Sequence, residues 1–125
     1  MEHAVPIVAI VDDDEAVRRA LRRLVLSLSH QPQTFASGEE FLDALKDFAP
    51  DCVLLDLHMP GLKGLDVIER LRSDDSRVPA IIITGYDETG MREKCLKAGA
   101  SAYLVKPVER VVMARAIEDA IAPSA

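Results

Sequence analysis

Residues 51–64, which read DCVLLDLHMPGLKG, decide the fold of this chain. The four apolar residues 52–55 follow one another without alternation, which is typical of a strand buried on both faces of a sheet. Asp56 comes directly after this run and precedes the turn signal Met59-Pro60-Gly61. We therefore expect the Asp56 carboxylate to emerge where the strand leaves the sheet, and its function depends on which groups lie opposite it.

Strand-like and helix-like segments alternate along the whole chain. Short apolar runs predict five strands, at residues 5–11, 33–36, 51–56, 79–84 and 102–105. Apolar residues at helical spacing predict helices between them, at residues 14–28, 37–48, 65–71, 88–98 and 112–121. This alternation predicts a single α/β domain with a parallel sheet that is covered by helices on both faces.

Local signals predict where two of the helices begin and end. The sequence SGEE at residues 37–40 matches a capping box for the second helix, with Leu45 and Phe48 on its apolar side. In the fourth helix we expect Leu96 to face inward, and we expect Gly99 to end the helix.

Composition and charge exclude several classes of protein. The 125 residues are 49% hydrophobic and 29% charged, as expected for one soluble domain over 1–125 with flexible ends at 1–4 and 122–125. The net charge of -6 argues against nucleic-acid binding by this domain, which needs a basic surface. No apolar run reaches the ~18 residues of a membrane span and no signal peptide is recognisable, so we expect a cytoplasmic protein without membrane contact. Cys52 and Cys95 lack metal-ligand spacing and are expected to be free thiols, with a disulfide as the less favoured alternative.

Polar side chains follow four of the five predicted strands, where each strand ends. They are Asp12 and Asp13 after the first strand, Asp56 after the third, Thr84 at the end of the fourth and Lys106 after the fifth. Ligands of such sheets bind beyond the carboxyl ends of the strands. If the first and third strands are neighbours, three carboxylates converge there beside a hydroxyl and an ammonium group.

Three converging carboxylates repel one another unless protonation or a cation neutralises them. Oxygen ligands without His or Cys suit Mg²⁺, with Mn²⁺ as an alternative, and an open metal position could accept a phosphoryl oxygen. Lys106 and Thr84 could hold further phosphoryl oxygens, which leaves Asp56 as the nucleophile for an aspartyl phosphate. Taken singly, each group has a simpler explanation as a helix end, a turn cap, a strand residue or a loop charge. Their joint occurrence at successive strand ends favours the site.

Two other features favour a structural explanation. The four arginines of the first predicted helix are expected to form a solvated face rather than a site, with a docking surface as the minority interpretation; they are Arg18, Arg19, Arg22 and Arg23. The ring of His58 is not expected to bind a metal, because no second His or Cys accompanies it.

Four motifs together resemble the receiver domain of response regulators in two-component signalling. They are IVDDDE at 10–15, LLDLHMPGLKG at 54–64, IIITG at 81–85 and KAGASAYLVKP at 97–107. The resemblance covers essentially the whole chain. It implies the CheY-like fold, a five-stranded doubly wound parallel sheet in the order 2-1-3-4-5 with five helices.

The resemblance also implies the chemistry of the site. Asp56 would accept a phosphoryl group from a sensor histidine kinase, with Mg²⁺ held by Asp12, Asp13, Asp56 and the backbone carbonyl of His58. Lys106 would contact the phosphoryl group, and its peptide bond to Pro107 would be cis.

The resemblance further implies a conformational switch. Thr84 would move toward the phosphoryl group and Tyr103 would turn inward into the space that Thr84 leaves. Phosphorylation would then change the face formed by the fourth helix, the fifth strand and the fifth helix. That face would control an output domain or a downstream protein, or form a phosphorylation-dependent homodimer.

Four positions bear on the particular properties of this site. Gly85 stands where many relatives carry Ala, and Val108 stands where Phe is common. His58 and Tyr86 are expected to flank the approach of the reacting water and to tune the lifetime of the aspartyl phosphate.

Two other functions remain as alternatives to the phosphoacceptor switch. A Mg²⁺-dependent aspartyl-phosphate hydrolase is suggested by the spacing of Asp12 and Asp14, although the Thr/Gly continuation of such enzymes and residues for a cap domain are absent. The other alternative is an interaction module that is never phosphorylated. We expect no enzyme activity other than self-catalysed phosphotransfer and dephosphorylation.

Overall fold

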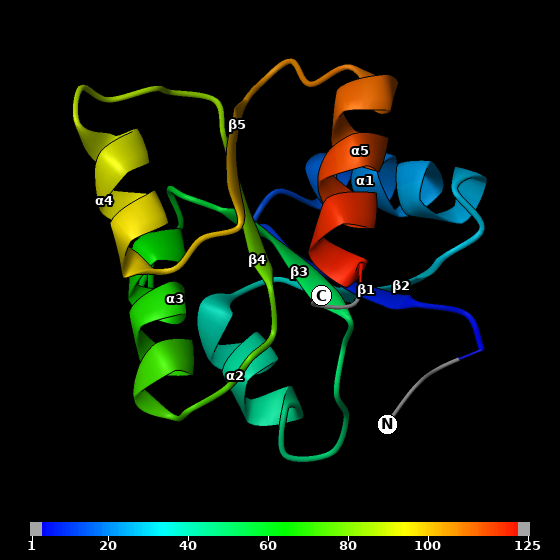
Figure 1. The fold of residues 1–125 in the computed structure, drawn as a ribbon, viewed down its shortest axis with the longest axis horizontal. Coiled ribbons are helices and arrows are strands. Elements are labelled where there is room, and N and C mark those ends of the chain that lie inside the picture. The colour runs from blue at the N-terminus through cyan, green and yellow to red at the C-terminus, as the bar shows by residue number, and fades with distance from the viewer. Residues whose placement is uncertain (1–3, 123–125) are drawn as a thin grey trace.

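The computed structural model describes residues 4–122, which form one five-stranded parallel sheet with helices on both faces (Figure 1). The strand order is β2-β1-β3-β4-β5, as the resemblance implied. In chain order the elements are β1 (Ile7–Val11), α1 (Glu15–Ser27), β2 (Gln31–Phe35), α2 (Gly38–Ala44), β3 (Cys52–Asp56), α3 (Gly64–Ser73), β4 (Ala80–Thr84), α4 (Met91–Ala98), β5 (Ala102–Val105) and α5 (Arg110–Ile121).

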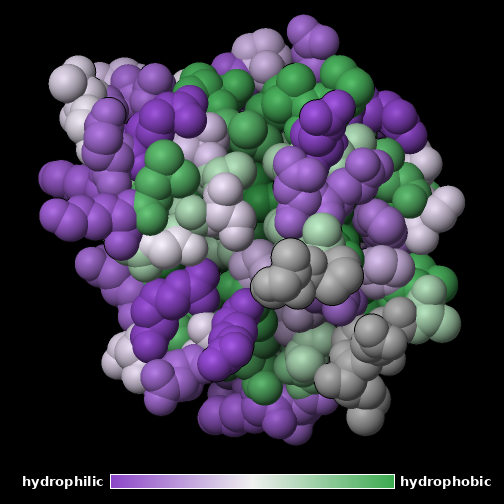
Figure 2. Space-filling model, in the orientation of Figure 1, coloured by the Kyte–Doolittle hydropathy of each residue, from purple (hydrophilic) through white to green (hydrophobic). Residues whose placement is uncertain are grey.

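Most of the expected flexible ends, at 1–3 and 123–125, lie outside the described residues. Within the described part of the chain, no helix has the length and apolar character needed to cross a membrane. On the face shown in Figure 2, hydrophilic residues cover much of the surface and hydrophobic residues form separate groups.

The sheet separates two hydrophobic clusters. Successive residues of a strand point to opposite faces, so Ala9 and Val11 of β1 pack beneath α2, α3 and α4, whereas Val8 and Ile10 pack beneath α1 and α5. The residues of β3 and β4 divide between the two clusters in the same way. This double burial explains why these strands are uninterrupted apolar runs in the sequence, and it confirms the prediction of a sheet covered on both faces.

The second helix is shorter than predicted. Its start is as expected at Ser37, whose hydroxyl accepts a hydrogen bond from the Glu40 backbone N–H at 3.1 Å. The Glu40 carboxylate accepts from the backbone N–H of Ala36 at 3.0 Å, one residue earlier than in a capping box. The helix ends at Ala44, so Leu45 and Phe48 lie in the connection to β3 and are only partly buried.

The fourth helix begins three residues later than predicted. Gly90 precedes it with a φ of +82°, a left-handed conformation that interrupts the helical path from Glu88. Gly99 ends the helix as predicted. Leu96 was expected to face inward, but 43% of its surface is exposed, because the short helix buries only Cys95 fully.

Helix α3 starts directly against the end of β3. A Cβ atom on Gly64 would lie 2.6 Å from the backbone oxygen of Asp56 and 3.0 Å from Cα of Leu57. Both are backbone atoms, which cannot move aside as a flexible side chain can. The absence of a side chain at Gly64 therefore determines how closely the helix approaches the strand that carries Asp56.

We expect Gly64→Ala to lower the free energy of unfolding by about 1–3 kcal/mol, the usual cost of overpacking. Gly85→Ala is the matched control, because a Cβ there would meet only Cδ of Lys106, at 3.9 Å. The control should change stability by less than about 0.5 kcal/mol. Urea unfolding of both variants measures the difference, and equal stabilities would contradict this account of the α3–β3 contact.

Candidate functional site

Three carboxylates meet at the carboxyl end of the sheet. Asp12 and Asp13 follow β1, Asp56 is the last residue of β3, and one oxygen from each lies within 4.8 Å of the others. The two strands are direct neighbours, and Val11 lies opposite Leu55. Asp12 and Asp56 come directly after these two residues and therefore lie close together. The structure thus brings together the three acids that the strand ends singled out in the sequence.

Asp12 is held on several sides and is only 3% exposed. Its Oδ1 accepts a hydrogen bond from the backbone N–H of Asp14 at 2.9 Å, and its Oδ2 lies 3.6 Å from Nζ of Lys106. The guanidinium of Arg18 donates to the backbone carbonyl of Asp12 at 2.7 Å. These contacts fix the position of Asp12 beside the other two acids.

The contact of Arg18 corrects the expectation that all four arginines of the first helix form a solvated face. Arg18 is partly buried against the acidic cluster, whereas the other three are exposed; they are Arg19, Arg22 and Arg23. A signal for this was present in the sequence, because a cation near the N-terminus of a helix opposes the helix dipole. Such a cation needs a hydrogen-bond acceptor elsewhere, and here the acceptor is the backbone carbonyl of Asp12.

Asp56 titrates unusually because of its surroundings. Partial burial raises the pKa of Asp56 to about 6, and the neighbouring charges of Asp12 and Asp13 raise it as well. The ammonium of Lys106 and the backbone N–H of His58, which donates to the carboxylate, lower the pKa but do not offset these effects. The ionised form of Asp56 is therefore costly until a further positive charge arrives.

The residues of the cluster fit a hard divalent cation. All three offer carboxylate oxygens, and no ring nitrogen or thiolate belongs to the cluster. Mg²⁺ takes few protein oxygens and keeps several waters, which a partly open group of three acids allows. A cation bound to the three acids would also lower the pKa of Asp56, because its charge offsets both the cost of burial and the repulsion from Asp12 and Asp13.

Thr84 and Lys106 complete the polar residues at this end of the sheet. Thr84 is fully buried; its hydroxyl donates to the backbone oxygen of Tyr86 at 2.9 Å and accepts from the Tyr86 N–H at 3.1 Å. Lys106 follows β5, where Val105 pairs with Thr84, and the Lys106–Pro107 peptide bond is cis. In this structure the Thr84 hydroxyl therefore binds its own loop.

Tyr103 is bound to the same loop. Its ring is buried, its hydroxyl donates to Oδ1 of Asp87 at 3.0 Å, and the guanidinium of Arg92 lies 5.1 Å from the ring centroid. Burial, followed by the contact with Asp87, raises the pKa of Tyr103 to about 12, so the hydroxyl stays protonated and able to donate. The resemblance implied that Tyr103 turns inward on phosphorylation, and here it is already buried.

A small group of side chains comes from the two loops that follow β3 and β4. Nε2 of His58 lies 3.2 Å from Oε1 of Glu88, and the rings of His58 and Tyr86 are 6.2 Å apart. Tyr86 is 68% exposed. Sequence reasoning singled out His58 and Tyr86 but missed Asp87 and Glu88, because nothing in a polar loop indicates which of its acids meets a distant side chain.

The fold and the site define the class of protein. A doubly wound parallel sheet that gathers three acids and a lysine beyond its strand ends is an α/β domain whose acids could hold a divalent cation. Residues 8–118 match the family model described as the response regulator receiver domain. The chain belongs to this family.

Relatives agree with the assignment. The response regulator protein TmoT of Ectopseudomonas mendocina is 36% identical over 115 residues, which are 92% of this chain and 52% of TmoT. The transcriptional regulatory protein FixJ of Bradyrhizobium diazoefficiens is 35% identical over 112 residues, 90% of this chain and 55% of FixJ. The chain thus spans about half the length of the curated relatives that it matches.

Solved structures show the same fold at higher coverage. The crystal structure of FixJ-N superposes with a TM-score of 0.88 and 32% identity, covering 97% of this chain and 95% of that one. A response regulator receiver protein from Burkholderia phymatum has a TM-score of 0.82 and 45% identity, with coverage of 93% and 94%.

The raised pKa of Asp56 predicts that its charge costs stability at neutral pH. The pKa of Asp56 is about 6 in the folded protein, and its ordinary value is 3.8. The folded protein therefore loses stability as the pH rises from 3.8 to about 6. A pKa shift of this size corresponds to a loss of about 3 kcal/mol in the free energy of unfolding. We halve this value because solvent screens the charge of the partly exposed Asp56. Asp56→Asn should therefore be about 1–2 kcal/mol more stable than wild type at pH 7.5, in chelator.

Urea unfolding at two pH values measures this effect. At pH 4 the difference between Asp56→Asn and wild type should shrink to a few tenths of a kcal/mol, since Asp56 is then protonated in the folded protein. A stability difference of equal size at both pH values would show that the change acts through packing and not through charge.

Proposed function

We propose that this domain is the phosphoacceptor switch of a two-component system, with Asp56 as the residue that is phosphorylated. The observation that carries this proposal is the meeting of oxygens from Asp12, Asp13 and Asp56 within 4.8 Å, with Nζ of Lys106 at 3.6 Å from Asp12. We further propose that residues 1–125 are one receiver domain and act in the cytoplasm. Membership of the receiver family supports both statements.

Asp12, Asp13, Asp56 and the backbone carbonyl of His58 would hold Mg²⁺, with Mn²⁺ as an alternative ion. The ion would neutralise the acids and a phosphoryl oxygen. An oxygen of Asp56 attacks phosphorus, the bond from phosphorus to the donor breaks, and the electron pair of that bond leaves with the donor. Lys106 supplies a point charge for the phosphoryl oxygens, which requires its ammonium to turn from Asp12.

The conformational switch would begin at Thr84. Donation to a phosphoryl oxygen requires the Thr84 hydroxyl to release the backbone of Tyr86, which it binds twice in this structure. The loop that follows also carries Asp87, the partner of Tyr103. A change at Thr84 would therefore reach β5 through one short loop, and phosphorylation would favour one of two arrangements of the α4–β5–α5 face.

The partners follow from this scheme. A sensor histidine kinase would supply the phosphoryl group, and the α4–β5–α5 face would act on an output domain, on a downstream protein or on a second copy of the domain. FixJ is a transcriptional regulatory protein by name, which makes transcription the first output to test. Beyond phosphotransfer and dephosphorylation at Asp56, we propose no enzyme activity.

The structure gives a specific reason to rank the hydrolase alternative lower. That alternative needs Asp14 as an acid beside Asp12. Instead, Oδ1 of Asp14 caps α1 by accepting from the N–H groups of Ala16 at 2.8 Å and Val17 at 3.3 Å. Asp14 is exposed and serves the start of the helix.

Incubation with acetyl phosphate and Mg²⁺ should add the mass of one phosphoryl group to the protein. Asp56→Asn should abolish the addition, because the amide lacks the attacking oxygen, whereas Asp47→Asn, which changes an exposed acid in the α2–β3 connection, should keep it. Intact-protein mass spectrometry reads both results. Labelling of Asp56→Asn would refute the assignment of the acceptor, and turnover of phosphomonoesters would favour the hydrolase.

His58 and Tyr86 should control how long the aspartyl phosphate lasts. Their rings are neighbours at the edge of the site, so replacing both with Ala should open the approach of water and speed dephosphorylation by about threefold or more. Release of phosphate after removal of acetyl phosphate gives the rate. Leu96→Ala, an exposed apolar change on α4, is the control, and an unchanged rate in the double variant would contradict the role.

A further inference from the structure

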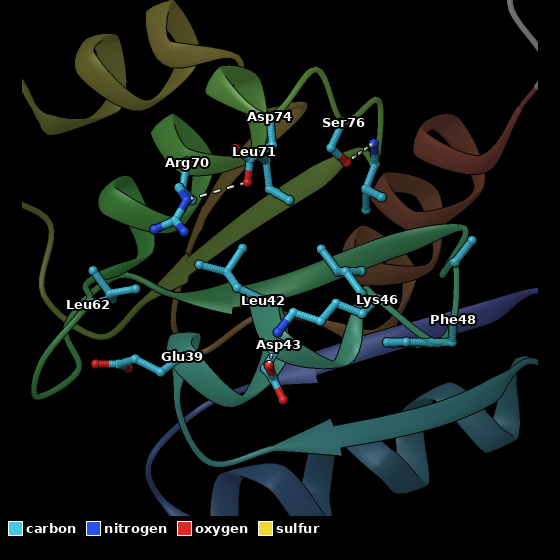
Figure 3. Close-up of a pocket in the computed structure, with 13 residues that line it drawn as sticks. Glu39, Leu42, Asp43, Lys46, Phe48, Leu62, Arg70, Leu71, Asp74 and Ser76 are labelled. Carbon is cyan, nitrogen blue, oxygen red and sulfur yellow. Dashed lines mark hydrogen bonds and ion pairs between the residues drawn. The ribbon is translucent and has the colours of Figure 1, made fainter.

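A groove of about 610 Å³ lies between α2 and α3 (Figure 3). It contains none of the residues that we assign to the phosphoryl site. Its floor is apolar and is formed by Leu42, Leu45, Phe48, Leu62, Leu71 and Val78. Five of these six side chains are only partly buried and lie at the edge of the hydrophobic cluster that also contains Tyr103.

The groove exists because α2 is short. The helix ends at Ala44, after seven residues, whereas the facing helix α3 has ten. Leu45 and Phe48 follow in the connection to β3, where they cover the lower part of α3 incompletely. Apolar surface that an extra turn of helix could cover is left open to solvent, and exposed apolar surface with a polar rim is typical of an interaction site.

The rim of the groove has a negative bias. Its two cations are already paired within their own segments, Lys46 with Asp43 at 2.7 Å and Arg70 with Asp74 at 3.4 Å. Glu39 stands at one end of the groove, and within residues 4–122 its carboxylate has no hydrogen-bonding or ion-pair partner (Figure 3). Beside the two cations, the rim carries three carboxylates, those of Glu39, Asp43 and Asp74.

The nearby cation of Arg72 is directed away from the rim. The guanidinium of Arg72 donates to the backbone oxygens of Ser76, Val78 and Gly99, so it serves the junction of α3 and α4. The two ion pairs of the rim are highly exposed, with more than 60% of each side chain accessible, and such pairs exchange partners readily. An incoming cation would therefore find Glu39 unpaired and two aspartates available.

We propose that the α2–α3 groove binds an amphipathic helix of a partner protein, with apolar side chains one turn apart on the floor and Lys or Arg on its flanks. This is the helix-in-groove mode of recognition. The groove is a separate site from the acidic cluster, because the two share no residue. The charge of the rim selects basic flanks, and the six floor side chains select the apolar anchors.

Two other occupants fit the groove less well. A small molecule would need several polar groups that converge on it, whereas here the polar groups lie along the rim. A second copy could offer its arginine-rich α1, but the exposed face of α1 carries a single large apolar residue, Leu26. A contact of α1 with α2–α3 would also be head-to-tail, and such contacts continue into chains unless their rotation closes a ring.

The test uses a 14-residue helical peptide of Leu and Lys, with Leu at positions 4, 7, 8 and 11, titrated into the isotope-labelled chain. Saturating Mg²⁺ and physiological salt shield the acidic cluster. Amide resonances of Leu42, Leu62, Leu71 and Val78 should shift, while those of Asp13 and Asp56 should not. A scrambled peptide of the same composition, and one with Glu in place of Lys, should bind at least tenfold more weakly.

Two variants locate the binding. Glu39→Lys and Leu42→Lys should each weaken binding of the peptide at least tenfold. If Leu42→Lys does not fold, the affinity of Glu39→Lys alone tests the proposal. The matched controls, Glu15→Lys and Leu26→Lys on α1, should change affinity less than twofold; both residues are exposed.

Three results would overturn the proposal: equal binding of the scrambled peptide, shifts confined to the acidic cluster or to α1, or no binding at 1 mM peptide. Self-association that Leu42→Lys abolishes would assign the groove to a second copy and would also overturn it.

Discussion

The repulsion among three carboxylates held together by a rigid sheet is the constraint on which the rest of this structure depends. Asp12 and Asp56 cannot separate, because β1 and β3 are adjacent and their apolar residues are buried on both faces. The core therefore maintains an unfavourable charge arrangement that the acids alone would not adopt. Lys106 offsets part of the repulsion, and burial together with the remaining repulsion raises the pKa of Asp56.

This constraint explains why the site can act as a switch. Groups that are already strained by repulsion gain most from an added cation and from a rearrangement of the charges around them. Two buried polar side chains near the strand ends, Thr84 and Tyr103, make their hydrogen bonds to a single loop, to Tyr86 and to Asp87. A change in charge at the acids would therefore act on the loop of Tyr86 and Asp87, whose hydrogen bonds are local and can be replaced by others.

Most of the fold and the acids of the site could be predicted from the sequence, since buried strands leave uninterrupted apolar runs and strand ends leave polar residues. The errors lie where tertiary contacts override local pattern. The late start of α4 depends on the left-handed backbone of Gly90, and the early end of α2 leaves Phe48 in a loop despite its helical spacing. The position of Arg18 at the start of a helix indicated that it needs a partner, but its partner is a backbone carbonyl, which every residue carries and which no sequence pattern identifies.

The α2–α3 groove lies in the same helical layer as Tyr103. Tyr103 belongs to the same hydrophobic cluster as Leu71 of the groove, so the groove and the proposed switch residue share one packed layer. Shared packing alone does not couple two sites, because a bound partner shifts an equilibrium only if it prefers one of its states. No hydrogen bond of the groove residues reaches Thr84, Tyr86 or Asp87 within the described chain. We therefore expect the groove to hold a partner equally well in both states, so that docking and switching are separate properties of one domain.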